Sequence, residues 1–157
     1  LDTHQQYVRQ DASWPNGCHI CEVEIDPGTG LVEITRYTVV DDFGTIINPI
    51  GHQGQIDGGV VTGLGLAMTE EFMVEEGRVL NGNLADYKLP TIADVPPLET
   101  VLIETVGGTG PYEAKAIGEL ANNATAAAIA NAVADAIGTR VFELPITAER
   151  VRAAGQG

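Results

Sequence analysis

The sequence predicts an α+β fold, in which a mixed or antiparallel sheet packs against two helices rich in small residues. Two observations lead to this class. Apolar and polar residues mix in short runs bounded by turn-forming residues, as in residues 18–26 and 31–41, which predicts strands. Two longer stretches, residues 52–71 and 120–137, combine glycine or alanine with spaced larger apolar residues, which predicts helices. The expected order is hairpin, helix, hairpin, strand, helix and strand.

The strands are expected between clear turn signals. The segment Asp26-Pro27-Gly28-Thr29-Gly30 is a turn that joins the first two strands into a hairpin. A second, shorter hairpin should turn at Glu76-Gly77-Arg78. The remaining expected segments are that short hairpin at 72–80, an extended stretch at 81–97, and strands at 98–106 and 140–144.

The helices differ in their small residues. The first carries four glycines close together, at Gly58, Gly59, Gly63 and Gly65. Because a glycine inside a helix costs about 1 kcal/mol relative to alanine, we expect another backbone or a flat ligand to contact that face. The second is alanine-rich, has one apolar stripe and should end at Gly138. A short terminal helix, residues 147–153, is expected to begin with Thr147 as its N-cap.

Length and charge limit the possible functions. A chain of 157 residues is expected to form a single domain over residues 1–157, with residues 1–13 as a tail or linker. Its formal charge is −14, which disfavours binding to nucleic acid and to anionic membrane surfaces. No apolar run reaches the roughly 20 residues that span a bilayer, and no signal-peptide pattern is visible. The polar start at Leu1 suggests a piece of a longer protein or a processed subunit.

Residues that ligate metals or act as nucleophiles show no familiar spacing. Cys18 and Cys21 lack the second pair that a zinc site needs, and on a strand they would point to opposite faces. Reduced thiols fit a cytoplasmic location. The three histidines, His4, His19 and His52, share no metal spacing. We therefore expect no metal held by protein side chains. The motif Gly-x-Ser-x-Gly of serine hydrolases is also absent.

A glycine-rich loop before the second helix is the best candidate for a ligand site. Residues 107–111 lack the ending of a phosphate-binding loop, yet Lys115 and Glu119 follow them just before a helix N-terminus. There a carboxylate could act as a general base. It could also be a first-turn glutamate that complements the helix dipole, and spacing alone favours this second interpretation. Gln53 and Gln55, at the start of the first helix, could cap that helix or face a ligand.

Several segments in a fixed order resemble a known family. They are Pro15-Asn16-Gly17-Cys18-His19, the glycine-rich residues 54–65, Asp86-Tyr87-Lys88-Leu89-Pro90, Gly110-Pro111-Tyr112-Glu113-Ala114-Lys115-Ala116-Ile117-Gly118-Glu119, and residues 143–151. Together they are similar to the C-terminal part of the molybdenum-binding large subunit of the xanthine dehydrogenase / aldehyde oxidase family. The first segment looks closer to the bacterial carbon-monoxide-dehydrogenase-like branch. The likeness covers roughly residues 14–152.

The resemblance implies a molybdenum–pyranopterin cofactor, possibly in its cytosine dinucleotide form, whose metal is held by the pterin. Glu119 matches the family's catalytic glutamate, the base that takes a proton while an electron-poor carbon is oxidised with water as the oxygen source. The implied cofactor contacts are Gln55, Gly58, Gly59, Lys115, Ala116 and Gly118. The implied partners are the remainder of the large subunit, iron–sulfur and FAD subunits or domains, and a small-molecule substrate. The chain alone should be inactive.

The chain also departs from the family pattern. Leu120-Ala121-Asn122-Asn123 follows Glu119, where the family often has a proline or small residues. Two other functions therefore stay open: a non-catalytic assembly or scaffolding chain that keeps the fold without cofactor, and an acidic metal- or ligand-binding module. The second would need a carboxylate cluster with calcium spacing, which the sequence does not show. Purines, N-heterocycles, aldehydes and carbon monoxide all remain open as substrates.

Overall fold

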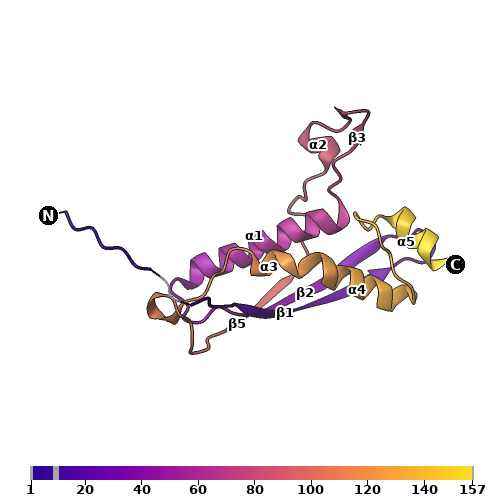
Figure 1. Ribbon diagram of the computed structural model, residues 1–157. Helices are drawn as coiled ribbons and strands as arrows, with labels where there is room; N and C mark the ends of the chain where they lie inside the picture. Colours follow the sequence, from indigo (N-terminus) through magenta and orange to yellow (C-terminus); the bar gives the residue numbers. More distant parts are fainter. Residues whose placement is uncertain (1, 9–10, 157) are drawn as a thin grey trace.

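The structure is a computed structural model that describes residues 2–8 and 11–156. A three-stranded sheet is covered on one face by helices that lie side by side (Figure 1). The expected α+β class is therefore confirmed, with a sheet of the mixed kind. Within the described part of the chain, no helix is both long and apolar enough to cross a membrane.

The sheet has the order β1-β2-β5. Strands β1 (Asn16–Ile25) and β2 (Val32–Asp42) form the expected antiparallel hairpin. Strand β5 (Leu98–Ile103) lies parallel to β2, with Tyr37 opposite Leu98 and Asp42 opposite Ile103. Because β2 and β5 are parallel, both end at the same edge of the sheet. The segments that follow them therefore start close together.

Helix α1 (Pro49–Met68) starts three residues before the expected position. The Asn48 side chain caps it by accepting a hydrogen bond from the Gly51 N–H at 3.0 Å. Pro49 takes the first helical position, where its missing N–H has no cost.

The second expected helix is divided into α3 (Leu120–Asn123) and α4 (Thr125–Ile137). Buried Thr125 donates its hydroxyl hydrogen to the Ala121 carbonyl at 2.7 Å, next to the break at Ala124. Such a bond from a side chain to a carbonyl four residues earlier often bends a helix. Gly138 ends α4 in a left-handed conformation, as expected.

The core lies between the helices and the sheet. Tyr37 and Val39 of β2, Ile56 and Val60 of α1, and Ile129 of α4 are fully or almost fully buried in one apolar cluster. The alternation of Tyr37 and Val39 is that of a strand with one face on the core. The spacing of Ile56 and Val60 is that of a helix with one face on the sheet.

An arm of residues 69–95 leaves the C-terminal end of α1 and returns to β5 (Figure 1). It contains the expected short hairpin, β3 (Val74–Glu75) and β4 (Arg78–Val79). It also contains a one-turn helix, α2 (Leu84–Tyr87), where an extended stretch was expected. That prediction was wrong because Asn83 caps α2, with its side-chain oxygen accepting from the backbone N–H groups of Ala85 and Asp86.

Two predicted strands also differ from the structure. Strand β5 ends at Ile103, three residues early, because Thr105 turns to bond Asp42. Residues 140–144 form no strand. Their strand-forming residues find no ladder partner, and the chain crosses to the end of α1, where the Ile146 N–H donates to the Ala67 carbonyl at 2.6 Å. The terminal helix α5 (Ala148–Gly155) follows, capped by Thr147 as expected.

Candidate functional site

Two glycines of α1 show how that helix packs against α3 and α4. A Cβ added at Gly59 would lie 2.9 Å from the Cβ of Ala121, and one added at Gly63 would lie 2.5 Å from the Cβ of Thr125. The contacts advance in the same direction along both segments, so α1 and α3–α4 run parallel. The N-terminus of α3, where Glu119 lies, is therefore beside the middle of α1, more than two turns after Pro49.

The glycines of α1 serve two different faces. Gly59 and Gly63 allow close contact with α3 and α4, because an added Cβ at either position would collide with those helices. A Cβ added at Gly54 or Gly58 would meet nothing within 4 Å. These two positions lie one turn apart on an exposed face. Of the two predicted reasons for the glycines, a close backbone is confirmed for Gly59 and Gly63, and contact with a flat ligand stays a prediction for the open surface at Gly54 and Gly58.

Glu119 lies at the junction between the loop and α3. Glu119 is exposed. Its backbone carbonyl accepts hydrogen bonds from the N–H groups of Asn122 and Asn123, both at 3.1 Å. Among the described residues, no hydrogen bond or ion pair engages its carboxylate. At the neighbouring Gly118 an added Cβ would also meet nothing within 4 Å. The carboxylate therefore adjoins open space and does not cap its own helix.

Most of the predicted cofactor contacts are exposed. Gln55 and Ala116 are exposed, like Gly58 and Gly118. Gln53, by contrast, turns toward the sheet and donates to Asp57 at 2.7 Å and to Thr100 at 3.0 Å. Of the two glutamines at the start of α1, Gln55 is therefore the one available to a ligand.

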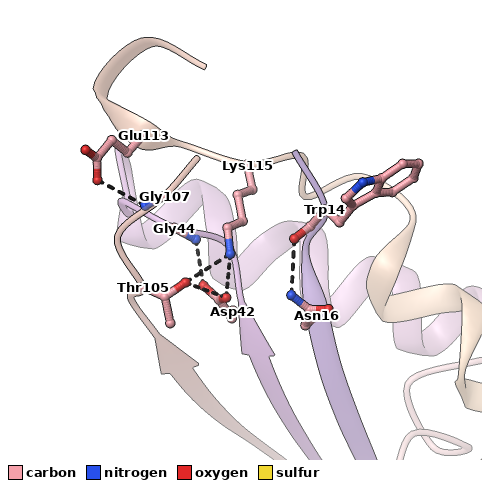
Figure 2. Close-up of polar contacts among 8 residues, drawn as sticks. All are labelled: Trp14, Asn16, Asp42, Gly44, Thr105, Gly107, Glu113 and Lys115. Carbon is pink, nitrogen blue, oxygen red and sulfur yellow. Dashed lines mark hydrogen bonds and ion pairs between the residues drawn. The ribbon is translucent and has the colours of Figure 1, made fainter. Parts of the chain in front are cut away.

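Lys115 is engaged within the chain. Its Nζ donates to the Asp42 carboxylate at 2.6 Å and to the Thr105 hydroxyl at 2.9 Å (Figure 2). Asp42 also accepts from the Thr105 hydroxyl at 2.6 Å and from the Gly44 N–H at 2.9 Å. We call Asp42, Thr105 and Lys115 the clasp. It ties the end of β2 and the segment after β5 to the loop that leads to Glu119.

The clasp keeps Asp42 ionised. Burial opposes its negative charge, but the hydrogen bonds from Lys115, Thr105 and Gly44 outweigh burial and hold the pKa of Asp42 below its usual range. Only 9% of the Lys115 side chain and 12% of the Asp42 side chain are exposed. The pair is therefore a nearly buried ion pair, which solvent screens less than a surface pair.

Backbone contacts reinforce the same loop. The Lys115 N–H donates to the Phe43 carbonyl at 2.8 Å, and Gly44 forms an isolated β-bridge with Ala114. Gly44 has φ of +63°, and a Cβ there would collide with the Glu113 carbonyl oxygen. Glu113 itself has φ of +62°, an uncommon conformation for a residue with a side chain. Surrounding contacts thus impose the path of the loop.

Sequence reasoning missed Asp42 and the neighbouring Asp41. The side chain of Asp41 is fully buried, with its Oδ1 3.7 Å from Nε2 of His19, and His19 Nδ1 lies 2.8 Å from the Tyr37 hydroxyl. One sequence signal could have revealed them: two successive carboxylates follow an apolar strand. They lie at the edge of the sheet where β2 ends and the following loop begins. The two carboxylates point to opposite faces, as neighbours on a strand do. Only Asp42 therefore faces the loop.

The remaining sequence candidates show no grouping among the described residues. Cys18 and Cys21 form no disulfide, and burial raises the pKa of Cys21 to about 11, which keeps that thiol protonated. Among the residues in view, no three His, Cys, Asp or Glu side chains gather as a metal site would require. Two surface crevices lie elsewhere, one beside Gly138 and the other at the base of the arm.

Comparisons with known proteins agree with this arrangement. Residues 1–96 match the family described as the molybdopterin cofactor-binding domain. The chain is 36% identical over 155 residues to the gamma subunit of the 6-hydroxypseudooxynicotine dehydrogenase complex of Paenarthrobacter nicotinovorans, covering 96% of this chain and 20% of that protein. It is 39% identical over 137 residues to a putative xanthine dehydrogenase molybdenum-binding subunit of Escherichia coli, covering 86% of this chain and 18% of that one.

Solved structures give the same result. A crystal structure of a Cu,Mo-containing CO dehydrogenase matches 96% of this chain and 19% of its own, with a TM-score of 0.88 and 32% identity. The chain spans about a fifth of the length of the relatives it matches. These matches confirm the likeness that the ordered motifs indicated. The chain belongs to the xanthine dehydrogenase / aldehyde oxidase family, within its molybdopterin cofactor-binding domain.

Proposed function

We propose that this chain supplies the catalytic base, Glu119, and part of the cofactor pocket of a molybdenum hydroxylase. The enzyme would oxidise an electron-poor carbon, such as that of an aldehyde or an N-heterocycle, with water as the oxygen source. One observation carries the proposal. Glu119 presents a carboxylate with no partner in the described chain, beside open backbone at Gly118 and at the N-terminus of α3, which packs against the middle of α1.

The residues present fit a flat, anionic cofactor. Gly58 and Gly118 leave backbone surface that a Cβ would otherwise cover, and Gln55, three residues before Gly58 on α1, offers both a donor and an acceptor. The first turns of helices carry unpaired N–H groups and a partial positive charge, which suit phosphate groups. We propose Gln55, Gly58, Gly59, Lys115, Ala116 and Gly118 as cofactor contacts, and a pyranopterin with or without a cytosine nucleotide as the group they contact.

Two of these contacts act indirectly in this proposal. Gly59 packs against Ala121 and so sets the distance between α1 and α3. Lys115 uses two of its three hydrogens within the clasp, so its main contribution is to hold the loop that carries Ala116 and Gly118.

Glu119 would act as a general base. When bound, the molybdenum cofactor would supply the redox chemistry, including the capacity to take up the two electrons removed from the substrate carbon. Glu119 accepts a proton at a carboxylate oxygen as the water-derived oxygen forms its bond to carbon. Because the carboxylate is not tied to its own helix, it can approach a substrate held by the rest of the pocket.

The rest of the enzyme lies outside these residues. We propose that the remainder of the large subunit completes the pocket and selects the substrate. Iron–sulfur and FAD subunits or domains would carry the electrons away. The assembly would work in the cytoplasm. The isolated chain should then be inactive. In support, the chain spans only about a fifth of its relatives, and the end that carries Glu119 is open.

The decisive experiment replaces Glu119 by glutamine in the assembled enzyme. Glu119→Gln keeps size and polarity but removes the base, so turnover should fall at least a hundredfold, the usual lower range for a general base, with molybdenum and pterin content unchanged. Glu113→Gln, in the same loop, is the matched control, because its amide oxygen can still accept from the Gly107 N–H. Near wild-type turnover in Glu119→Gln would refute the assignment.

Metal and pterin analysis separates this proposal from a scaffolding chain. Molybdenum and pterin in stoichiometric amounts in the intact complex would support the proposal. An assembly that is active without either would favour the scaffolding alternative.

A further inference from the structure

Four polar side chains lie buried between the sheet and the break that separates α3 from α4. The side chains of Asp41 and His19 are 0% and 1% exposed, and Tyr37 and Thr125 are fully buried. Burying a polar group without a full set of hydrogen bonds costs free energy. None of the four takes part in the chemistry proposed above, so their presence in an apolar core needs another reason.

The four side chains follow one another from the sheet to α3. Nε2 of His19 lies 3.7 Å from Oδ1 of Asp41, which is longer than a hydrogen bond, and Nδ1 of His19 lies 2.8 Å from the Tyr37 hydroxyl. Burial raises the pKa of Tyr37 to about 12, against a hydrogen bond with the Thr125 side chain that lowers it. Thr125 in turn donates to the Ala121 carbonyl of α3 at 2.7 Å. A continuous line of polar contacts therefore joins β1 and β2 to α3.

The Asp41 end of this line is incompletely paired. Among the described residues, Nε2 of His19 and both carboxylate oxygens of Asp41 have no hydrogen-bond partner. Gly17 lies opposite Asp41 in the hairpin, and a Cβ there would collide with Oδ1 of Asp41, so glycine leaves the room that this carboxylate occupies. Apolar residues of similar volume often stabilise a core as well as a buried charged pair does. Stability alone therefore does not account for Asp41 and His19.

We propose that the four side chains together position Glu119 and act through α3. We call them the buried relay: Asp41, His19, Tyr37 and Thr125. Glu119 immediately precedes α3, and its carbonyl accepts hydrogen bonds from N–H groups of that helix, so a displacement of Ala121 moves Glu119 as well. A misplacement of about 1 Å can lower the rate of an enzyme about a hundredfold. The inference rests on the proposed function only in taking Glu119 as the base.

Near-isosteric variants of the assembled enzyme test the relay. Tyr37→Phe removes the hydroxyl between His19 and Thr125 and keeps the buried ring. Thr125→Val removes the bond to the Ala121 carbonyl, whereas Thr125→Ser keeps it. We expect kcat to fall about tenfold in Tyr37→Phe and in Thr125→Val, with KM and molybdenum content unchanged, and to stay near the wild-type value in Thr125→Ser. Wild-type kcat in both Tyr37→Phe and Thr125→Val would overturn the proposal.

Val39→Ala is the matched control for a loosened core. Val39 is buried on the same strand between Tyr37 and Asp41, so the variant opens a cavity and removes no polar group. It should lower the Tm at least as much as Tyr37→Phe and leave kcat unchanged. An equal fall of kcat in Val39→Ala and Tyr37→Phe would also overturn the proposal, because general loosening would then explain both.

Hydrogen exchange separates the relay from the role of Glu119. The amides of residues 119–125 in the large subunit should exchange several-fold faster in Tyr37→Phe and Thr125→Val than in the wild type or in Thr125→Ser. This measurement needs neither turnover nor molybdenum. Unchanged exchange there would overturn the relay even if Glu119→Gln is inactive. Faster exchange combined with wild-type turnover in Glu119→Gln would support the relay and refute only the assignment of the base.

Discussion

Glycine residues have different roles on the two faces of α1: on one face they allow close helix packing, and on the other they leave the backbone exposed. On the inner face, Gly59 and Gly63 let α3 and α4 approach so closely that a single added carbon would collide. On the outer face, Gly54 and Gly58 adjoin empty space. A glycine in a helix weakens it wherever it lies, so the inner pair is explained by packing within this domain. The outer pair has no such explanation here, which is why we propose Gly58 as a cofactor contact.

The largest effect is expected on the inner face. Gly63→Ala would place a Cβ 2.5 Å from the Cβ of Thr125 and 2.9 Å from Oδ1 of Asn122, forcing the helices apart. Overpacking outweighs the gain in helix propensity, for a net loss of about 2 kcal/mol. Hydrogen exchange of the α1 amides in the large subunit should accelerate about thirtyfold. Unchanged hydrogen-exchange protection of the α1 amides would show that α3 and α4 can move aside without loss of stability. The contrast between the two faces of α1 would then disappear.

A smaller effect is expected at the clasp, which holds the loop beside the outer face. Asp42→Asn keeps an oxygen for the Gly44 N–H but removes the charge that pairs with Lys115. We expect a loss of about 1 kcal/mol near pH 7, with faster hydrogen exchange concentrated in residues 104–118. Thr38→Asn, on the same strand, is a control for a general effect of asparagine on β2.

The pH dependence follows from the lowered pKa of Asp42. A carboxyl group whose pKa is lower in the folded state stabilises the fold above its unfolded pKa of about 3.9, and this contribution disappears as the pH falls through the folded value. The gap in Tm between the wild type and Asp42→Asn should therefore be constant from pH 7 to about pH 5 and narrow in stronger acid. A gap that widens in acid would contradict the ion-pair interpretation.

The smallest change in stability, with a clear change in binding, is expected on the outer face. Gly58→Ala meets no atom of this chain, so the helix should gain up to about 1 kcal/mol. Cofactor content should nevertheless fall, because the added methyl occupies the space assigned to the pterin. Pterin and molybdenum analysis of Gly58→Ala and Gly63→Ala side by side makes the comparison directly. Full cofactor content in Gly58→Ala would remove the proposed role of that face.

The sequence by itself predicted the regular elements whose signals are local. The turn at Asp26–Gly30, the hairpin at Glu76–Arg78 and the ends of helices at Gly138 and Thr147 are confirmed. Each depends on residues within a few positions of one another. The family was also readable from the sequence, because its motifs keep their order along the chain.

Only the tertiary structure decided which contacts those elements make. Asp42 and Lys115 are 73 positions apart, and neither signals the other in the sequence. Residues 140–144 have strand-forming side chains but no ladder partner, and Thr125 breaks a helix that its neighbours favour. The glycines of α1 look alike in the sequence and become distinct only when α3 and α4 cover one side. Local propensity sets what a segment can form, whereas packing sets what it contacts, and so which of its faces stays open to a ligand.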